Sequence, residues 1–167
     1  MNIKTLFCIV GGGPSGLMLG LLLAKQGIDV TVLESKVKFE RQFRGEVLQP
    51  RFVHLMRELN LNTYLEKYEH IKLPSGEVWN ANQKVLSIDY AKDTSEIPYA
   101  VRMKQSVLLT AFYDLAKKYL SFHFYFNAKV KSFLQGSDER ITGLIPAIDH
   151  KDTIISADLV VGADGRF

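Results

Sequence analysis

Cysteine and histidine are scarce in this sequence. Its 167 residues include one cysteine, Cys8, so neither a disulfide framework nor a multi-cysteine metal site can form within the chain. The four histidines are scattered, with no His-x-x-x-His or His-x-Glu spacing that would support a zinc site. We therefore expect no bound metal, and the single thiol fits a reducing, cytoplasmic location.

The sequence also lacks an excess of charge of one sign and a long apolar run. Twenty-one Lys and Arg against eighteen Asp and Glu give a net charge of +3, spread along the chain, which argues against a nucleic-acid partner. The apolar stretch Leu17–Ala24 is far shorter than the roughly 20 residues that span a bilayer. Gly11 to Pro14 interrupt the run that a signal peptide would need. We expect no stable membrane insertion.

The overall composition is that of a globular domain. Hydrophobic residues make up 47%, charged residues 23% and aromatic residues 11%, a balance that excludes disorder and low complexity. At about 150 residues per domain, the length predicts a single domain spanning residues 1–167.

The first third of the chain has the pattern of a strand, a helix and a second strand. Leu6–Val10 is a short apolar run that ends at three glycines, as a buried strand would. Ser15–Gln26 has helical periodicity and ends before Gly27, a typical C-terminal cap. Val30–Leu33 is a second buried strand. The order predicts a βαβ unit with parallel strands and a right-handed crossover.

The remaining chain mixes helices with antiparallel strands. Helices are expected at Pro50 to about Asn60 and at Gln105–Tyr119, and the Pro- and Gly-containing region Ile71–Tyr99 indicates an antiparallel excursion. Further strands are expected at Phe122–Phe126, Lys129–Leu134, Ile141–Ile148, Thr153–Ala157 and Leu159–Val161, with turns at 136–138 and 150–152. We predict an α/β fold, a Rossmann-like parallel sheet with an added antiparallel β-meander and excursion.

The glycine cluster after the first strand carries the clearest chemical signal. Residues 11–16, Gly-Gly-Gly-Pro-Ser-Gly, satisfy G-x-G-x-x-G between a strand and a helix. Gly11 permits a tight turn, Gly13 lets the backbone approach a pyrophosphate, and Gly16 allows close packing of the helix on the strand. Pro14 and Ser15 open the helix, whose N-terminal N–H groups favour phosphate. A simple turn without a ligand is the alternative.

Glu34 and the two residues after Gly16 restrict which class of nucleotide this motif can bind. Leu17-Met18 stand where a phosphate-binding P-loop needs Lys and Ser or Thr, so a P-loop is excluded. Glu34 ends the second strand, where an acidic side chain accepts hydrogen bonds from both hydroxyls of an adenosine ribose and repels a 2′-phosphate. The sequence therefore predicts FAD or NAD rather than NADP as the tightly held nucleotide.

Three further motifs follow the glycine fingerprint in order: Arg44-Gly45-Glu46-Val47-Leu48-Gln49-Pro50, Gln105-Ser106-Val107-Leu108-Leu109 and Asp158-Leu159-Val160-Val161-Gly162-Ala163-Asp164-Gly165. Together they resemble the FAD-binding domain of single-component aromatic hydroxylases, the flavoprotein monooxygenases of the para-hydroxybenzoate hydroxylase type. The resemblance runs from the N-terminus to the last residue. It is least specific in the excursion.

The resemblance implies a set of cofactor-binding positions. Arg44, next to Gly45, matches an arginine that reaches the phosphate and ribose region, and Gln105 matches a position that bonds the cofactor near its ribityl chain. Val130 matches a position that offers backbone groups to adenine, and Asp164 belongs to a motif associated with FAD and the nicotinamide reductant. The alternatives are a solvated arginine, a glutamine bonded to its own backbone, a core valine and an ordinary Asp-Gly turn. Arg102 could replace Gln105.

The resemblance also implies an activity. FAD would be the cofactor and NAD(P)H the reductant, and one oxygen atom would pass from O₂ to an aromatic or similar small organic substrate. The alternatives are a reductase or halogenase with the same cofactor domain, a non-catalytic dinucleotide-binding fragment and an NAD-dependent module without flavin. No residue is assigned a catalytic role. The family's later Gly-Asp motif and substrate-covering sheet are absent, so we expect a cofactor domain that is incomplete at its C-terminus.

Overall fold

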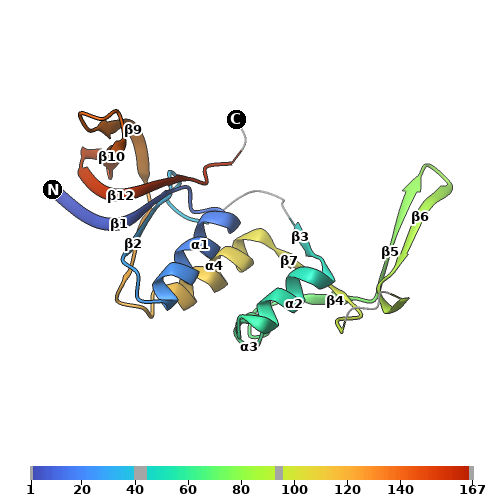
Figure 1. Ribbon diagram of the computed structural model, residues 1–167. Helices are drawn as coiled ribbons and strands as arrows, with labels where there is room; N and C mark the ends of the chain where they lie inside the picture. The colour runs from blue at the N-terminus through green and yellow to red at the C-terminus, as the bar shows by residue number, and fades with distance from the viewer. Residues whose placement is uncertain (1, 40–44, 93–95, 166–167) are drawn as a thin grey trace. The chain divides into compact units, whose positions relative to one another are not determined.

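The computed structural model describes residues 2–39, 45–92 and 96–165 (Figure 1). The chain divides into two compact units, the first made of Met1–Glu40 with Phe112–Phe167 and the second of Arg41–Ala111. The expected single domain concerns the whole chain and stays a prediction.

The first unit is built on a parallel sheet. Four neighbouring strands run parallel in the order β12, β1, β2, β8, with bounds Ile154–Gly162, Asn2–Val10, Val30–Leu33 and Phe122–Tyr125. All four residues of β2 are buried, as expected for a central strand covered on both faces. The predicted βαβ unit and Rossmann-like parallel sheet are confirmed.

An antiparallel meander continues this sheet beyond β12. It consists of β9, β10 and β11, with bounds Ala128–Gln135, Ile141–Ile148 and Lys151–Asp152, and β10 pairs with β12. The prediction of two separate strands at Thr153–Ala157 and Leu159–Val161 is wrong, because the chain stays extended through Asp158 as one strand. Pairing with β1 along both ends of β12 keeps it extended, and Leu159 is 50% exposed rather than buried.

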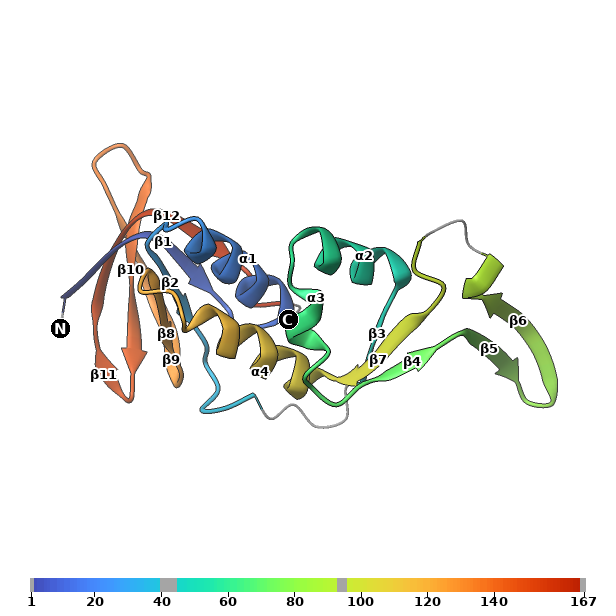
Figure 2. The same ribbon diagram turned by 90° about the horizontal axis from the view of Figure 1, so that it is seen from below.

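Helix α1, Pro14–Lys25, packs on the parallel sheet (Figure 2). It begins with Pro14 at its first turn and ends before Gly27, whose φ of +74° and hydrogen bond to the carbonyl of Ala24 form the expected C-terminal cap. A Cβ on Gly20 would lie 2.8 Å from Cγ2 of Val32, so the helix backbone closely approaches β2.

Half-buried aromatic side chains in and just after β8 form a cluster within the first unit. The rings of Phe124 and Phe126 lie 4.7 Å apart between centroids, and Phe39 and Tyr113 pack against them at 4.9 to 5.8 Å. These rings pack mainly edge to face, as in protein cores. Tyr113 lies in helix α4, Gln105–Ala116.

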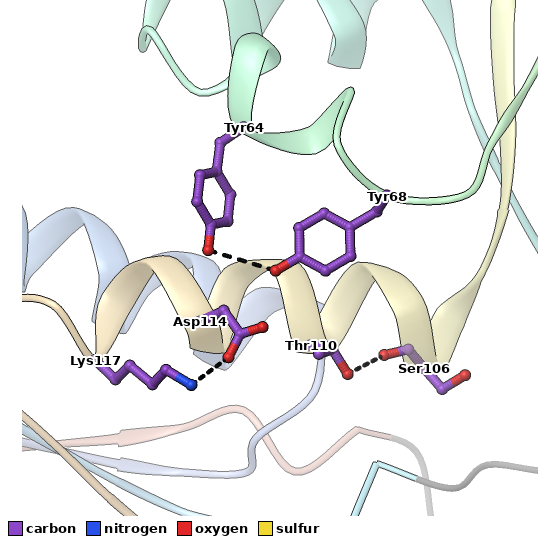
Figure 3. A network of polar contacts seen from close by, with 6 residues as sticks. All are labelled: Tyr64, Tyr68, Ser106, Thr110, Asp114 and Lys117. Carbon is purple, nitrogen blue, oxygen red and sulfur yellow. Dashed lines mark hydrogen bonds and ion pairs between the residues drawn. The ribbon is translucent and has the colours of Figure 1, made fainter.

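Polar side chains on α4 are satisfied locally (Figure 3). The hydroxyl of Thr110 donates to the carbonyl of Ser106 one turn earlier at 2.8 Å. Just beyond the helix, Lys117 forms an ion pair with Asp114 at 2.5 Å. These contacts stay within the helix and its end, so they contribute to local stability rather than to a binding site.

The second unit contains a three-stranded antiparallel sheet in the order β3, β7, β4, with bounds Gly45–Leu48, Ala100–Lys104 and Ile71–Leu73. Helix α2, Pro50–Glu58, begins at the predicted proline, whereas β3 and the short helix α3, Asn62–Leu65, were not predicted. The hydroxyl of Tyr68 donates to that of Tyr64 in α3 at 3.4 Å (Figure 3).

A two-stranded hairpin completes the second unit and confirms the antiparallel excursion. It is formed by β5, Ser75–Asn80, and β6, Gln83–Asp89, and is followed by the 3₁₀ turn Tyr90–Lys92. Almost every residue of its two strands is exposed, and Trp79 donates to Glu77, which also binds Lys84.

Candidate cofactor site

The glycine turn after β1 is shaped by its own backbone. Gly11 has a φ of +114°, and its N–H donates to the carbonyl of Leu33 at 2.8 Å. A Cβ on Gly11 would lie 2.4 Å from the carbonyl oxygen of Ala163, closer than side chains are found. Only glycine fits this position, so the expected tight turn at Gly11 is present.

Gly16 permits an equally close approach inside the turn. A Cβ on Gly16 would lie 1.9 Å from the carbonyl oxygen of Gly11 and 3.3 Å from Cγ2 of Ile9. The first turn of α1 therefore presses against the end of β1, which is the close helix packing that the fingerprint predicts.

Gly13 differs from both of these glycines, because it faces open space. Its φ is −75°, and a Cβ placed on it would meet no atom within 4 Å. The fold itself does not require glycine here. A backbone position without a side chain at the start of a helix leaves room for a ligand to come close.

The N-terminus of α1 is suited to an anion. Gly13 caps the helix without a side-chain hydrogen bond, Pro14 has no N–H, and the first bond inside the helix joins Leu17 to Gly13. Helix geometry thus leaves the N–H groups of Ser15 and Gly16 without an intrahelical partner. No acidic residue lies in the first turn of α1 itself, where a negative charge would compete with a phosphate.

The side chain of Glu34 holds the glycine turn by hydrogen bonds to backbone N–H groups. Its side chain is only 4% exposed, and Oε2 accepts a hydrogen bond from the N–H of Gly12 at 3.0 Å. Oε1 accepts from the N–H of Lys36 at 2.9 Å and from the hydroxyl of Ser35 at 3.2 Å. Sequence reasoning assigned Glu34 to a ribose and missed this contact with Gly12; the ribose contact stays a prediction.

The end of β12 meets the same turn. The N–H of Ala163 donates to the carbonyl of Val10 at 2.7 Å, and a Cβ on Gly11 would lie 2.8 Å from Cα of Asp164. Asp164 is exposed two residues after the end of β12. The structure therefore brings Asp164 next to the glycine turn, at the carboxyl edge of the parallel strands where open α/β sheets bind ligands.

Val130 lies in β9, opposite Pro146, and its half-buried side chain packs against the hydrophobic core that contains Cys8 and Leu33. The core interpretation is correct for the side chain, and the backbone contact with adenine stays a prediction.

Burial makes the thiol of Cys8 unreactive. It is fully buried in β1, and removal from water raises the pKa of its thiol from an ordinary 9.0 to about 12. Since the thiolate is the reactive form, Cys8 is not a nucleophile at neutral pH.

The second unit, taken by itself, contains a hydrogen-bonded side-chain pair that includes the predicted residue Gln105. Gln105 is 4% exposed at the start of α4, and its Nε2 donates to Oε1 of Glu46 in β3 at 2.5 Å. Gln105 therefore does not use this amide nitrogen on its own backbone. Glu46 was not predicted, although an acidic residue inside the Arg44–Pro50 motif was a usable signal.

For the other predicted residues of the second unit, the structure gives only strand pairing and exposure. Gly45 pairs with Lys104 across the sheet, and Arg44 lies outside the described residues. Arg102 lies exposed in β7, opposite Val47, whereas Gln105 is buried. Which of the two contacts the cofactor stays a prediction.

The described part of the chain contains neither a metal-ligand cluster nor a membrane-spanning helix. No group of three His, Cys, Asp or Glu side chains there is arranged to hold a metal ion. No helix within residues 2–39, 45–92 and 96–165 has the length and apolar character to cross a bilayer.

The chain matches known flavoproteins over nearly its whole length. A family model described as an FAD binding domain matches residues 4–167. A 6-methylpretetramide 4-monooxygenase from Streptomyces rimosus is 27% identical over 96% of this chain and 38% of its own length. A flavin-dependent halogenase, armH5 from Armillaria mellea, is 36% identical over 42% of this chain and 13% of its own length.

The fold is also found in a solved monooxygenase structure. The p-nitrophenol 4-monooxygenase PnpA from Pseudomonas putida DLL-E4 superimposes with a TM-score of 0.85 at 23% identity, over 98% of this chain and 41% of that one. The chain thus spans less than half the length of these relatives. It belongs to the FAD binding domain family of the FAD-dependent aromatic monooxygenases and halogenases.

Proposed function

We propose that this chain is the FAD-binding part of an NAD(P)H-dependent flavoprotein monooxygenase that hydroxylates an aromatic or similar small organic substrate. The monooxygenase relative supports this over most of the chain, whereas the halogenase relative matches less than half of it. NAD(P)H as the reductant is part of the proposal.

One observation carries the cofactor assignment. Gly13 opens to empty space at the N-terminus of α1, next to two glycines that the packing of the fold itself requires. A glycine that no neighbouring atom demands is explained by a ligand that must come close to the backbone. The pyrophosphate of a dinucleotide has the charge and size for this place.

The residues proposed to hold FAD are those that the sequence predicts. The glycine turn and the start of α1 would bind the pyrophosphate, and Glu34 the adenosine ribose. The full proposed set is Gly11, Gly13, Pro14, Ser15, Gly16, Glu34, Arg44, Gly45, Gln105, Val130 and Asp164. When bound, the flavin supplies redox and oxygen chemistry that side chains lack, while the protein holds and orients it.

The proposal is tested on purified protein. We expect the yellow absorbance of bound flavin, its bleaching by NADH or NADPH, and consumption of O₂ that rises when a hydroxylatable aromatic compound is added. Protein without flavin absorbance that nevertheless binds NAD would support the flavin-free alternative. Bound flavin that neither nicotinamide bleaches would point to a different flavoenzyme.

A flavin-dependent halogenase is the second candidate. The supporting observation is the 36% identity with the Armillaria halogenase over 70 residues, higher per residue than that with the monooxygenase. Product formation that requires chloride or bromide would favour this candidate, and halide-independent hydroxylation would exclude it.

A further inference from the structure

One face of the three-stranded sheet in the second unit carries an arginine between two aliphatic side chains. Residues that pair directly across an antiparallel ladder share one face of the sheet. Arg102 in β7, the central strand, pairs with Val47 in β3 and with Ile71 in β4 (Figure 2). These three side chains, which we call the Arg102 row, therefore cross the sheet in one line, with neighbouring strands about 4.8 Å apart.

The opposite face of the same sheet belongs to the core of the second unit. Val101 and Met103, the neighbours of Arg102 along β7, are 9% and 4% exposed. Together with Met56 of α2 they line one cavity, so this face of the sheet is the one that α2 covers. Because successive side chains of a strand alternate between the two faces, Arg102 points away from α2.

The Arg102 row exposes aliphatic surface where a sheet normally presents polar side chains. Val47 is 45% exposed and Ile71 is 56% exposed. An antiparallel sheet with one buried face usually has polar residues on the face that meets water. Binding sites for small organic molecules combine apolar surface with a few polar groups that set orientation. Two aliphatic side chains on either side of one charged group have this composition.

The guanidinium of Arg102 has no partner of opposite charge among the described residues. Nζ of Lys104, the next cation along this face of β7, lies 4.0 Å from Oε2 of Glu69, so that carboxylate is already engaged. Glu46 pairs with Met103 and therefore belongs to the opposite face. A guanidinium presents N–H groups in a planar fork that matches a carboxylate, and it also stacks on aromatic rings.

We propose that the Arg102 row binds an aromatic compound that carries a carboxylate. The carboxylate pairs with the guanidinium of Arg102, and the ring packs against the flanking aliphatic side chains of Val47 and Ile71. This deepens the proposed function by naming the class of substrate, and it rests on that function for the identification of this ligand as the substrate. The binding itself involves residues of the second unit alone.

Benzoate and its neutral counterpart benzamide test the charge. Isothermal titration calorimetry should give a Kd for benzoate about fivefold lower than that for benzamide, the upper range of an ion pair at an exposed site. Arg102→Met removes the charge and keeps an unbranched side chain, so the two Kd values should become equal. Arg57→Met, at an exposed position of α2 in the same unit, is the matched control and should keep the fivefold preference.

Acetate tests the apolar contact, because it has the charge without the ring. It should bind at least about threefold more weakly than benzoate. Ile71→Ser removes aliphatic surface beside Arg102. This variant should weaken benzoate binding by about threefold and leave acetate binding unchanged.

The melting temperature of every variant is recorded, and Arg102→Lys provides a second variant that keeps the charge but not the planar fork. It should prefer benzoate more than Arg102→Met does and less than the unaltered protein does. A benzoate preference that persists in Arg102→Met would overturn the proposal, and so would equal binding of acetate and benzoate. Loss of benzoate binding in saturating FAD would assign the Arg102 row to the cofactor and would also overturn it.

The proposed function fails separately from this inference. If the unaltered protein does not bind FAD, the proposed function is rejected. The benzoate, benzamide and acetate titrations still decide whether the Arg102 row binds an aromatic acid, since they require no flavin.

Discussion

The predicted cofactor residues of the two units lie in different kinds of local structure. In the first unit the glycine turn consists of backbone, shaped by atoms that lie too close for any side chain at Gly11 or Gly16. In the second unit two side chains, Glu46 and Gln105, are joined by one hydrogen bond. The glycine turn, the backbone part, tolerates no added atoms. The Glu46–Gln105 pair, the side-chain part, needs matching hydrogen-bond donors and acceptors. The first should therefore fail when atoms are added and the second when donors and acceptors are exchanged.

The largest effect is expected from Gly16→Ala, in the crowded part of the turn. The new methyl would meet the carbonyl oxygen of Gly11 at 1.9 Å, where only backbone can yield. We expect the free energy of unfolding to fall by about 3 kcal/mol, measured by urea titration. Gly76→Ala is the matched control, because a Cβ there meets nothing within 4 Å. Equal stability of the two variants would show that the turn has room for a methyl group at position 16.

Gly13→Asp should separate binding from folding. Its Cβ meets no atom within 4 Å, and Asp is a good N-cap, so the melting temperature should stay constant or rise. The added negative charge should weaken FAD binding by about thirtyfold, roughly 2 kcal/mol. Fluorescence titration with FAD measures this. Full flavin retention in the variant would mean that the fingerprint is not the binding site.

Glu34→Gln probes a side chain that supports the glycine turn through hydrogen bonds. The amide keeps the shape but loses the charge that strengthens the bonds from the N–H groups of Gly12 and Lys36. We expect a loss of about 1.5 kcal/mol in the free energy of unfolding. Glu139→Gln, at an exposed position of the same unit, should have no measurable effect. If both variants melt alike, Glu34 does not hold the turn.

Cys8, in β1, should have the smallest effect on the free energy of unfolding, and this effect depends on pH. Burial raises the pKa of its thiol from 9.0 to about 12, so above pH 9 the unfolded chain loses a proton that the folded chain retains. Stability from this group is complete below the unfolded pKa and falls by about 1.4 kcal/mol between pH 8 and pH 10. Urea unfolding of the protein and of Cys8→Ala checks this: the variant should show the shallower decline. Equal slopes would contradict the burial effect.

The backbone part was predictable from sequence because local rules determine it. Three glycines between an apolar strand and an apolar helix allow few conformations, and β2 was predicted at its observed bounds, Val30–Leu33. The same applies to β10 and to the start of α2 at Pro50. In each case the pattern and the terminating residue lie within a few positions of each other.

The side-chain part could not be predicted, because it depends on strand pairing between distant segments. The contact of Glu46 with Gln105 exists only because β3, a short strand in a polar region, pairs with β7. The continuous β12 was missed for the same reason: pairing with β1 keeps Asp158 extended, although its own sequence indicates a break. Tertiary pairing overrides local preference in both cases.

The pairing of β1 with β12 also sets an order of events during synthesis. Asn2 pairs with Ile154 and Val10 with Gly162, so β1 waits for the much later β12 before the edge that faces it is covered. The carbonyl of Ala163, against which Gly11 is fitted, arrives at the same late moment. Contacts this distant in sequence slow folding. A nascent chain stalled before residue 154 should therefore be aggregation-prone and unable to retain a nucleotide, even though its glycine fingerprint is already complete.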